Sequence, residues 1–265
     1  MATTATWTAV MVEEEEAGVG VVEETTKNAP DEISPDVLIH GRGVTVDASW
    51  GHIYGPVDIT VRRGGVTVLV GQGGRGRTAL LLTLAGRMKP TGGSLSAFGD
   101  DTSVRRLFDN AAIAFVSEVD GIEQTIRVSD VVTEQLRWGA PWHQWVRPGT
   151  EEDLERICRP VFGPLSLPRM DAMVEELPEL TAALFRIAVA NVRKPPLLVV
   201  GGIDNLTSIA GARHLLDRLV ALGEHQTVIT ADVNGVARDE LRDVIDVPNL
   251  TDREFAALEK EAIAP

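Results

Sequence analysis

The residues from Gly71 to Thr78 have the composition and spacing of a loop that binds phosphate. They read Gly71, Gln72, Gly73, Gly74, Arg75, Gly76, Arg77 and Thr78, where phosphate-binding loops read G-x-x-x-x-G-K-[ST]. Successive glycines let backbone N–H groups turn towards phosphate oxygens, and a helix starting here would add its positive end. Arg77 keeps a positive charge in the lysine position, but its planar guanidinium is not equivalent to an ammonium group. Thr78 supplies a hydroxyl that can reach Mg²⁺.

Two elements must position this loop. The β-branched run Val66–Val70 predicts a strand that is buried on both faces. The segment from about Arg77 to Arg87 predicts a helix directly after the loop. A strand, a glycine-rich loop and a helix in this order are the setting in which such a loop binds phosphate. A generic glycine-rich turn is the alternative, and the setting favours the phosphate loop.

Short strands and a central helical stretch make up the rest of the chain. Strands are predicted at 37–39, 44–46, 57–61, 94–98, 113–117, 197–200 and 227–230. Apolar spacing near 3.6 residues predicts helices between about 128 and 192 and an amphipathic helix at 252–262. We therefore expect an α/β fold with a mainly parallel central sheet, an N-terminal layer of β-strands and a helical subdomain at about 119–192.

Charge separates a tail from a folded body. Residues 1–36 carry nine acids and one lysine, which account for −8 of the net charge of −14. This segment has few large apolar side chains, so it predicts a disordered solubilising tail, with an acidic docking arm as the alternative. The domain is predicted at 37–265. The acidic balance argues against nucleic-acid binding.

The sequence shows no signal for export, membrane crossing or a disulfide. No apolar run approaches the ~18 residues of a membrane span, and no basic n-region precedes an apolar stretch at the start. The single cysteine, Cys158, excludes an internal disulfide and is expected to be a small apolar filler. These features predict a cytoplasmic protein.

The segment Leu69–Gly99 resembles the opening of an ABC-transporter ATP-binding subunit. In that family a strand, a phosphate loop, a helix ending in Leu-Ala-Gly and a Lys-Pro-Thr-x-Gly turn follow one another. Here Leu84-Ala85-Gly86 and Lys89–Gly93 match the last two. The resemblance covers about 37–232 and weakens towards the C-terminal end. It implies a P-loop NTPase-like fold with ATP and Mg²⁺ as cofactors.

The resemblance also implies binding residues. ATP is expected on the loop from Gly71 to Ala79, with its adenine stacked on Trp50. Tyr54 is the second choice for stacking, and a tryptophan packed at a sheet edge is the alternative reading of Trp50. Mg²⁺ is expected at Thr78 and at Glu118, which stands where the family has a glutamine after a strand. A solvated loop acid is the alternative reading of Glu118.

The groups that drive hydrolysis in this family are missing. Glu179 has entered the helix-opening signature Leu-Ser-Gly-Gly-Gln, which reads LPELT here, and an acid at a helix start repels phosphate. Gly201 and Gly202 stand where the family has Asp-Glu. Asp204, arriving late, either holds Mg²⁺ through water or caps the next helix. Ala231 takes the place of a histidine. No catalytic residue is assigned, and whether the chain is an enzyme stays open.

Taken together, the resemblance implies an ATP-binding subunit of a membrane transport system, with hydrolysis that is weak or dependent on a partner subunit. A permease would hold it on the inner face of the cell membrane, beside a second nucleotide-binding subunit in a homodimer or heterodimer. The alternative is a non-hydrolysing nucleotide sensor or scaffold outside transport. A soluble P-loop kinase is disfavoured because it would have lysine at position 77.

Three of the five tryptophans lie close together in the helical stretch. Trp138, Trp142 and Trp145 are spaced i, i+4, i+7, which predicts one helical face, although Gly139 and Pro141 interrupt the helix. Large aromatic side chains are common interface anchors. The stripe therefore predicts either a docking face for a membrane subunit or part of the subdomain core.

Overall fold

The structure is a computed structural model that describes residues 34–71, 74–99, 104–116, 125–141, 143, 145–235, 239–247 and 254. All of them belong to the compact unit that spans residues 33–265. The predicted tail up to residue 33 and most of the predicted helix at 252–262 lie outside the described residues. So do Gln72, Gly73, Glu118 and Trp142.

Two sheets form the framework of the fold. The larger sheet is parallel, with its strands in the order β5 (Ala111–Ala114), β6 (Leu197–Val200), β7 (Thr227–Asp232), β3 (Gly65–Val70) and β8 (Asp243–Asp246). The smaller sheet is antiparallel, in the order β2 (Gly51–Arg62), β1 (Val37–Ala48) and β4 (Gly92–Ala97). The predicted α/β fold, with a parallel central sheet and an N-terminal layer of strands, is confirmed.

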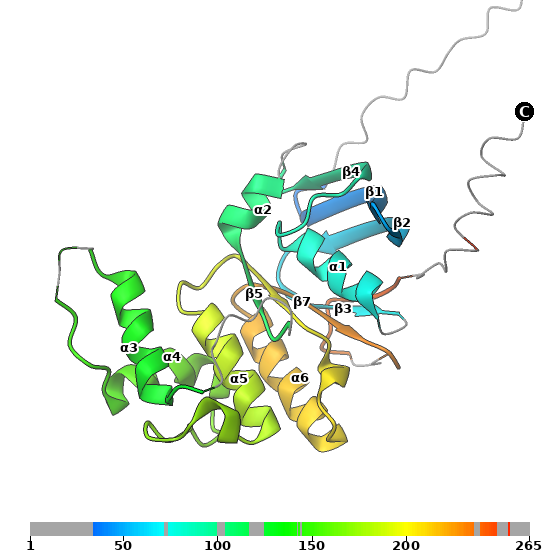
Figure 1. Cartoon of the computed structure of the whole chain (residues 1–265). Helices are drawn as coiled ribbons and strands as arrows, with labels where there is room; N and C mark the ends of the chain where they lie inside the picture. Colours follow the sequence, from blue (N-terminus) through cyan, green and yellow to red (C-terminus); the bar gives the residue numbers. More distant parts are fainter. Residues whose placement is uncertain are drawn as a thin grey trace, which may run out of the picture. The chain divides into compact units, whose positions relative to one another are not determined.

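Helix α1 (Arg75–Leu84) packs between the two sheets (Figure 1). It contacts β2 of the antiparallel sheet and β6 and β7 of the parallel sheet. Along β6 the side chains alternate, because Leu197 and Val199 join the core around α1 while Leu198 and Val200 join the core on the other face. A strand covered on both faces must be apolar throughout, which explains the unbroken run in the sequence.

The carboxyl ends of β3, β6 and β7 lie along one edge of the parallel sheet, since these strands are neighbours in the order β6, β7, β3. Open α/β sheets bind their ligands at this edge. The segments that follow the three strands are the phosphate loop, the pair Gly201-Gly202 and the residues after Asp232. Candidate residues that are far apart in the sequence therefore converge in space.

Helices cover the other face of the parallel sheet. Helix α6 (Ile209–Gly223) contacts β3 and β7, and α5 (Glu179–Ala190) contacts β5 and α6. Helix α4 (Glu151–Phe162) packs on α5, and α3 (Val128–Gly139) contacts α4. Cys158 is fully buried in α4, where burial raises the pKa of its thiol to about 12. The predicted role of Cys158 as an apolar filler is confirmed.

Several elements differ from the sequence expectation. Helix α1 begins at Arg75 rather than Arg77, and it ends at Leu84 because Gly86 turns the chain with φ of 70°. Helix α2 (Val104–Asn110) and the edge strand β8 were not predicted, since both are short and polar. Two 3₁₀ turns, η1 (Val174–Glu176) and η2 (Ile203–Asn205), precede α5 and α6. None of the helices formed by the described residues has the length and apolar character that a membrane crossing requires.

Asp153 fastens the start of α4 to the preceding chain. Its carboxylate accepts hydrogen bonds from Arg147 Nη1 (2.6 Å) and from the backbone N–H of Thr150 (3.0 Å), and the residue is only 3% exposed. Replacing Asp153 by alanine removes both bonds, including the one by which its side chain completes the capping box with Thr150. We expect a loss of about 2 kcal/mol of stability, which lowers the melting temperature by about 4–8 °C.

The pH dependence of the stability loss distinguishes the charge of the Asp153 carboxylate from the packing of its side chain. The hydrogen bond from Arg147 holds the pKa of the Asp153 carboxyl well below its usual range. The stabilisation is therefore complete above the unfolded pKa of about 4 and is lost as the pH falls below it. The difference in melting temperature between the wild type and Asp153→Asn should narrow on acidification. A difference that does not change with pH would contradict this assignment.

Candidate functional site

The phosphate loop joins β3 to α1, in the setting that the sequence predicts. Gly71 follows β3, and its N–H donates to the backbone carbonyl of Asp232 at the end of β7 (3.2 Å). Gly74 has φ of 147°, a conformation that favours glycine, and it immediately precedes Arg75, the first residue of α1. The first N–H groups of a helix have no acceptor within the helix. The first turn of α1 therefore offers donors to an anion at this point.

The side chain in the lysine position is engaged in an ion pair. Arg77 Nη2 donates to Asp204 Oδ2 at 2.7 Å, and the two side chains are 11% and 18% exposed. Asp204 lies in η2, directly after the glycines that follow β6. The Nη1 atom of Arg77 and the Oδ1 atom of Asp204 are buried and have no hydrogen-bond partner. The pair thus links the phosphate loop to the end of β6 and keeps two polar atoms unsatisfied.

The sequence did not predict this pair. Its members are 127 positions apart, and the only signal was an arginine in the lysine position together with an isolated acid after a strand. The expected alternative role of Asp204, capping the next helix, is wrong. Ser208 caps α6 instead, because its hydroxyl accepts the N–H of Gly211 (3.2 Å).

A side chain at either of the two glycines after β6 would meet neighbouring atoms at short distances. A Cβ atom added at Gly201 would lie 1.8 Å from the carbonyl oxygen of Phe115. One added at Gly202 would lie 2.3 Å from Asp204 Oδ1 and 3.0 Å from Arg77 Nη2. Both distances to oxygen are shorter than real contacts allow. The backbone of Phe115 therefore excludes a side chain at position 201, whereas a side chain at position 202 would have to displace the ends of the Asp204 and Arg77 side chains.

The end of β7 also lacks a catalytic side chain. Ala231 is fully buried, so the place of the expected histidine is filled by a methyl group in the core. The neighbouring Thr230 hydroxyl donates to the carbonyl of Gly201 (2.8 Å), which ties β7 to the turn after β6. No imidazole from this strand can reach a phosphate.

The first residue of α5 is an acid, Glu179, whose carboxylate contacts the turn before α6. Glu179 accepts hydrogen bonds from the backbone N–H and the hydroxyl of Thr207, both at 2.9 Å. These bonds lower the pKa of Glu179, so the acid is ionised at neutral pH. A negative charge in the first turn neutralises the positive helix end and repels a phosphate. The sequence indicated the repulsion but not the contact with Thr207.

Trp50 lies near the phosphate loop and is available for stacking. It is 65% exposed in the turn between β1 and β2, and the guanidinium carbon of Arg75 lies 5.8 Å from the centroid of its ring. The alternative reading of a tryptophan packed at the sheet edge does not fit this exposure. Tyr54 is excluded as a stacking residue because it is 2% exposed and donates its hydroxyl to Thr83 (2.8 Å). Burial raises the pKa of Tyr54 to about 12.

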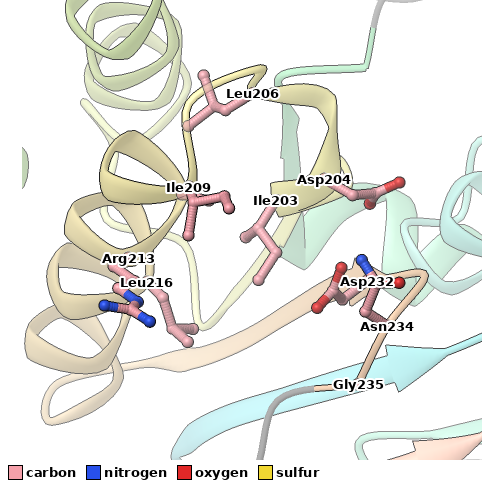
Figure 2. A pocket seen from close by; sticks show the side chains of 10 residues that line it. Ile203, Asp204, Leu206, Ile209, Arg213, Leu216, Asp232, Asn234 and Gly235 are labelled. Carbon is pink, nitrogen blue, oxygen red and sulfur yellow. The ribbon is translucent and has the colours of Figure 1, made fainter.

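A pocket of about 470 Å³ adjoins the ion pair. Its apolar wall comes from η2 and α6, and its polar wall from the residues around the end of β7 (Figure 2). The lining includes Ile203, Leu206, Ile209, Leu216, Asp204, Arg213, Asp232 and Asn234. Asp232 is 7% exposed and lies beside Asn234, across from Ile203. The pocket extends the candidate site from the phosphate loop towards α6.

The described residues fit a Mg²⁺ ion poorly. In nucleotide sites this ion is commonly held by one or two carboxylates together with the phosphates. Thr78 offers a hydroxyl, but the Asp204 carboxylate is paired with Arg77 and the glycines after β6 offer nothing. Within the described ranges, no group of three or more His, Cys, Asp or Glu side chains could hold a metal. Glu118, the other expected ligand, lies outside them.

The tryptophan stripe does not form one helical face. Helix α3 ends at Gly139, so Trp145 is not on the helix that carries Trp138. Trp138 is 69% exposed and Trp145 is 98% exposed, so neither belongs to the core of the helical region. Trp138 and Val192, which follows the end of α5, both line a hollow of about 380 Å³. The exposed side chains of Trp138 and Trp145 are therefore open to a partner. Trp142 lies outside the described residues.

These features define a class of protein. A parallel sheet with a glycine-rich loop between a strand and a helix, open at the carboxyl edge, is the P-loop nucleotide-binding fold. The family model for ABC transporters matches residues 54–200, which is more than half of the chain. The chain belongs to the ABC transporter family.

Individual relatives share modest identity. The ribose import ATP-binding protein RbsA of Cereibacter sphaeroides is 30% identical over 162 residues, which cover 56% of this chain and 30% of the relative. The cytochrome c biogenesis ATP-binding export protein CcmA of Pseudomonas putida is 26% identical over 106 residues, 40% of this chain and 49% of the relative. The chain spans about a third of the length of the sugar-import relatives it matches.

Solved structures support the fold. The cbiO1 protein of Clostridium perfringens, part of the ABC transporter complex cbiONQ, aligns with a TM-score of 0.58 at 19% identity. The alignment covers 86% of this chain and 93% of that one. At this identity the likeness concerns the fold alone.

Proposed function

We propose that this chain is the ATP-binding subunit of an ABC-type membrane transport system. The observation that carries the proposal is the phosphate loop, in which Gly74 opens α1 at the carboxyl edge of the sheet and Arg77 supplies a positive charge. ATP would be held by the loop from Gly71 to Ala79, with its adenine on Trp50. Relatives named for import and export support the transport role.

Members of this family bind ATP, generally with Mg²⁺. In this chain Thr78 is the described residue that we propose faces an ion accompanying the phosphates, and Glu118 is the second proposed ligand. The hydroxyl of Thr78 stands at the start of α1, where the sequence pattern of such loops puts it.

Hydrolysis by the isolated chain would be weak. General-base and electrostatic groups supply most of the rate in phosphoryl transfer. Here Gly202 holds no base, and Ala231 is a buried methyl group. The geometry therefore supports nucleotide binding better than turnover.

The proposed dimer is asymmetric. In an ABC dimer, as the family resemblance implies, each site combines one subunit's phosphate loop with the other subunit's signature helix. The ionised Glu179 at the start of α5 repels a facing phosphate. In a homodimer of this chain, Glu179 would therefore repel the phosphates at both nucleotide sites. A second subunit with an intact signature would restore one of them, so we propose a heterodimer.

The proposed partner on the membrane side is a permease subunit, which would hold this chain at the inner face of the membrane. Trp138 and Trp145 are the exposed anchors available for it. Replacing Trp145 by alanine should leave the melting temperature unchanged, because exposed substitutions usually change stability by at most about 0.5 kcal/mol. The same change should reduce association with permease-containing membranes by about tenfold or more, as expected for an interface hot spot.

The matched control is Phe108→Ala, which removes another exposed aromatic side chain, on α2. Sedimentation of each variant with membranes from cells that co-express the proposed permease subunit gives the comparison. Unchanged association of both Trp138→Ala and Trp145→Ala would refute the docking face. A large drop in melting temperature for Trp138→Ala would instead show that this side chain packs within the fold.

A further inference from the structure

The segment that follows β6 offers no free carboxylate to a divalent cation. The segment after β6 is where a carboxylate would approach the phosphates, and it begins with two glycines. Position 201 cannot carry a side chain, because a Cβ there would lie 1.8 Å from the carbonyl oxygen of Phe115. At position 202 a Cβ would lie 2.3 Å from Asp204 Oδ1 and 3.0 Å from Arg77 Nη2, so the ends of these two side chains would have to shift. Neither residue can be restored as a metal ligand without moving its neighbours.

The one carboxylate that this segment does deliver is already neutralised. Asp204 Oδ2 accepts from Arg77 Nη2 at 2.7 Å, and the pair is more than four-fifths buried. Charges this close and this shielded from water interact much more strongly than surface charges. A cation approaching Asp204 would have to displace the guanidinium or remain beside its positive charge. Both are unfavourable for Mg²⁺.

The guanidinium of Arg77 has one nitrogen that lacks an acceptor. Its Nη1 atom is buried and has no hydrogen-bond partner, although Nη2 on the same group is satisfied by Asp204. A buried donor without an acceptor is costly, so an acceptor at this point is favoured. Guanidinium groups bind phosphate through several N–H donors held in a plane. A phosphate oxygen that displaces the atoms covering Nη1 would satisfy this donor, while Nη2 keeps its bond to Asp204.

We propose that this chain binds nucleoside di- or triphosphates without needing Mg²⁺, with Arg77 as the counter-charge and Asp204 as the residue that positions it. The proposal rests on the nucleotide-binding function proposed above and deepens it. The family generally pairs its nucleotide with Mg²⁺, and the residues described at this site have replaced that arrangement with an internal ion pair. Thr78 can still face an ion, but the ion adds little to the affinity.

The test compares ADP binding to the full chain by calorimetry in excess Mg²⁺ and in excess EDTA. We expect the two dissociation constants to agree within about threefold, a difference of under 1 kcal/mol. Arg77→Ala should weaken binding in EDTA by about tenfold or more, the scale of a lost charge-assisted hydrogen bond. Arg105→Ala is the matched control, since Arg105 also has an aspartate neighbour, Asp109, but lies on α2.

A second readout follows the metal directly. Mn²⁺ bound to ADP, detected by electron paramagnetic resonance, should be held no more tightly when the protein is added. Two results would overturn the inference while leaving nucleotide binding intact. One is that the wild type binds ADP about tenfold or more weakly in EDTA than in Mg²⁺. The other is that Mn²⁺ is bound more tightly in the complex of protein and ADP than by ADP alone. Binding of ADP in neither buffer would instead refute the proposed function itself.

Discussion

Replacing Gly76 by aspartate should reduce the affinity for ATP by about 100-fold or more, or nearly 3 kcal/mol. Gly76 is buried in the first turn of α1, next to the open backbone donors that the phosphates would use. A carboxylate there would take these donors for itself and repel the nucleotide. An acid in the first turn is favourable for the helix, but burying a carboxylate at position 76 costs stability, so the fold must be checked alongside the affinity. Calorimetry measures the affinity, and a thermal melt checks the fold.

The matched control is Gly76→Ala, which adds a Cβ atom without a charge. Its affinity should fall less than that of the aspartate variant, because repulsion is the larger part of the effect. If the aspartate variant binds ATP as tightly as the wild type, the phosphates do not sit at the start of α1, and the assignment of the loop from Gly71 to Thr78 is wrong.

A glutamate introduced at position 202 should fail to produce an active ATPase. We expect turnover to stay at least about 100-fold below the roughly 1–100 per second of kinases. A Cβ atom at this position would lie 2.3 Å from Asp204 Oδ1, so the new side chain must displace the ion pair or be displaced by it. The glutamate would also pair with Arg77, which removes the free carboxylate that a general base needs.

The Gly202→Glu variant is best compared with the double variant Gly202→Glu/Asp204→Ala. The double variant opens the space beside position 202, yet Gly201 and Ala231 still leave the site without their usual side chains. We expect its turnover to remain low as well. Robust turnover by Gly202→Glu alone, lost when Thr78 is replaced by valine, would show that the site is closer to catalytic competence than its packing indicates.

Much of the fold could be predicted because it depends on local patterns. The runs at β3 and β6 are apolar without alternation, since both faces of each strand are covered by cores. The loop between β3 and α1 was predicted because its glycine spacing is specific. The strand β8 gave no comparable signal, because a four-residue edge strand with an acid at each end does not differ from a loop in sequence.

The site was less accessible to prediction because its decisive contacts join distant segments. The missing carboxylates after β6 were evident from the sequence, but the closeness of Phe115 to Gly201 was not. Likewise, an acid in the signature position was evident, whereas its bonds to Thr207 depend on how α5 meets the turn before α6. The tryptophan spacing was misleading, since α3 ends at Gly139 before the pattern is complete.

The central claim is that this chain holds ATP without efficiently hydrolysing it on its own. A single-turnover experiment tests it most directly: excess purified protein is mixed with trace radiolabelled ATP, and bound nucleotide is recovered and identified over time. We predict saturable binding that is lost in Gly76→Asp, with the bound nucleotide recovered as ATP after many minutes. Conversion to ADP at about 1 per second or faster, within the usual range of kinases, by the wild type but not by Gly76→Asp, would contradict the claim.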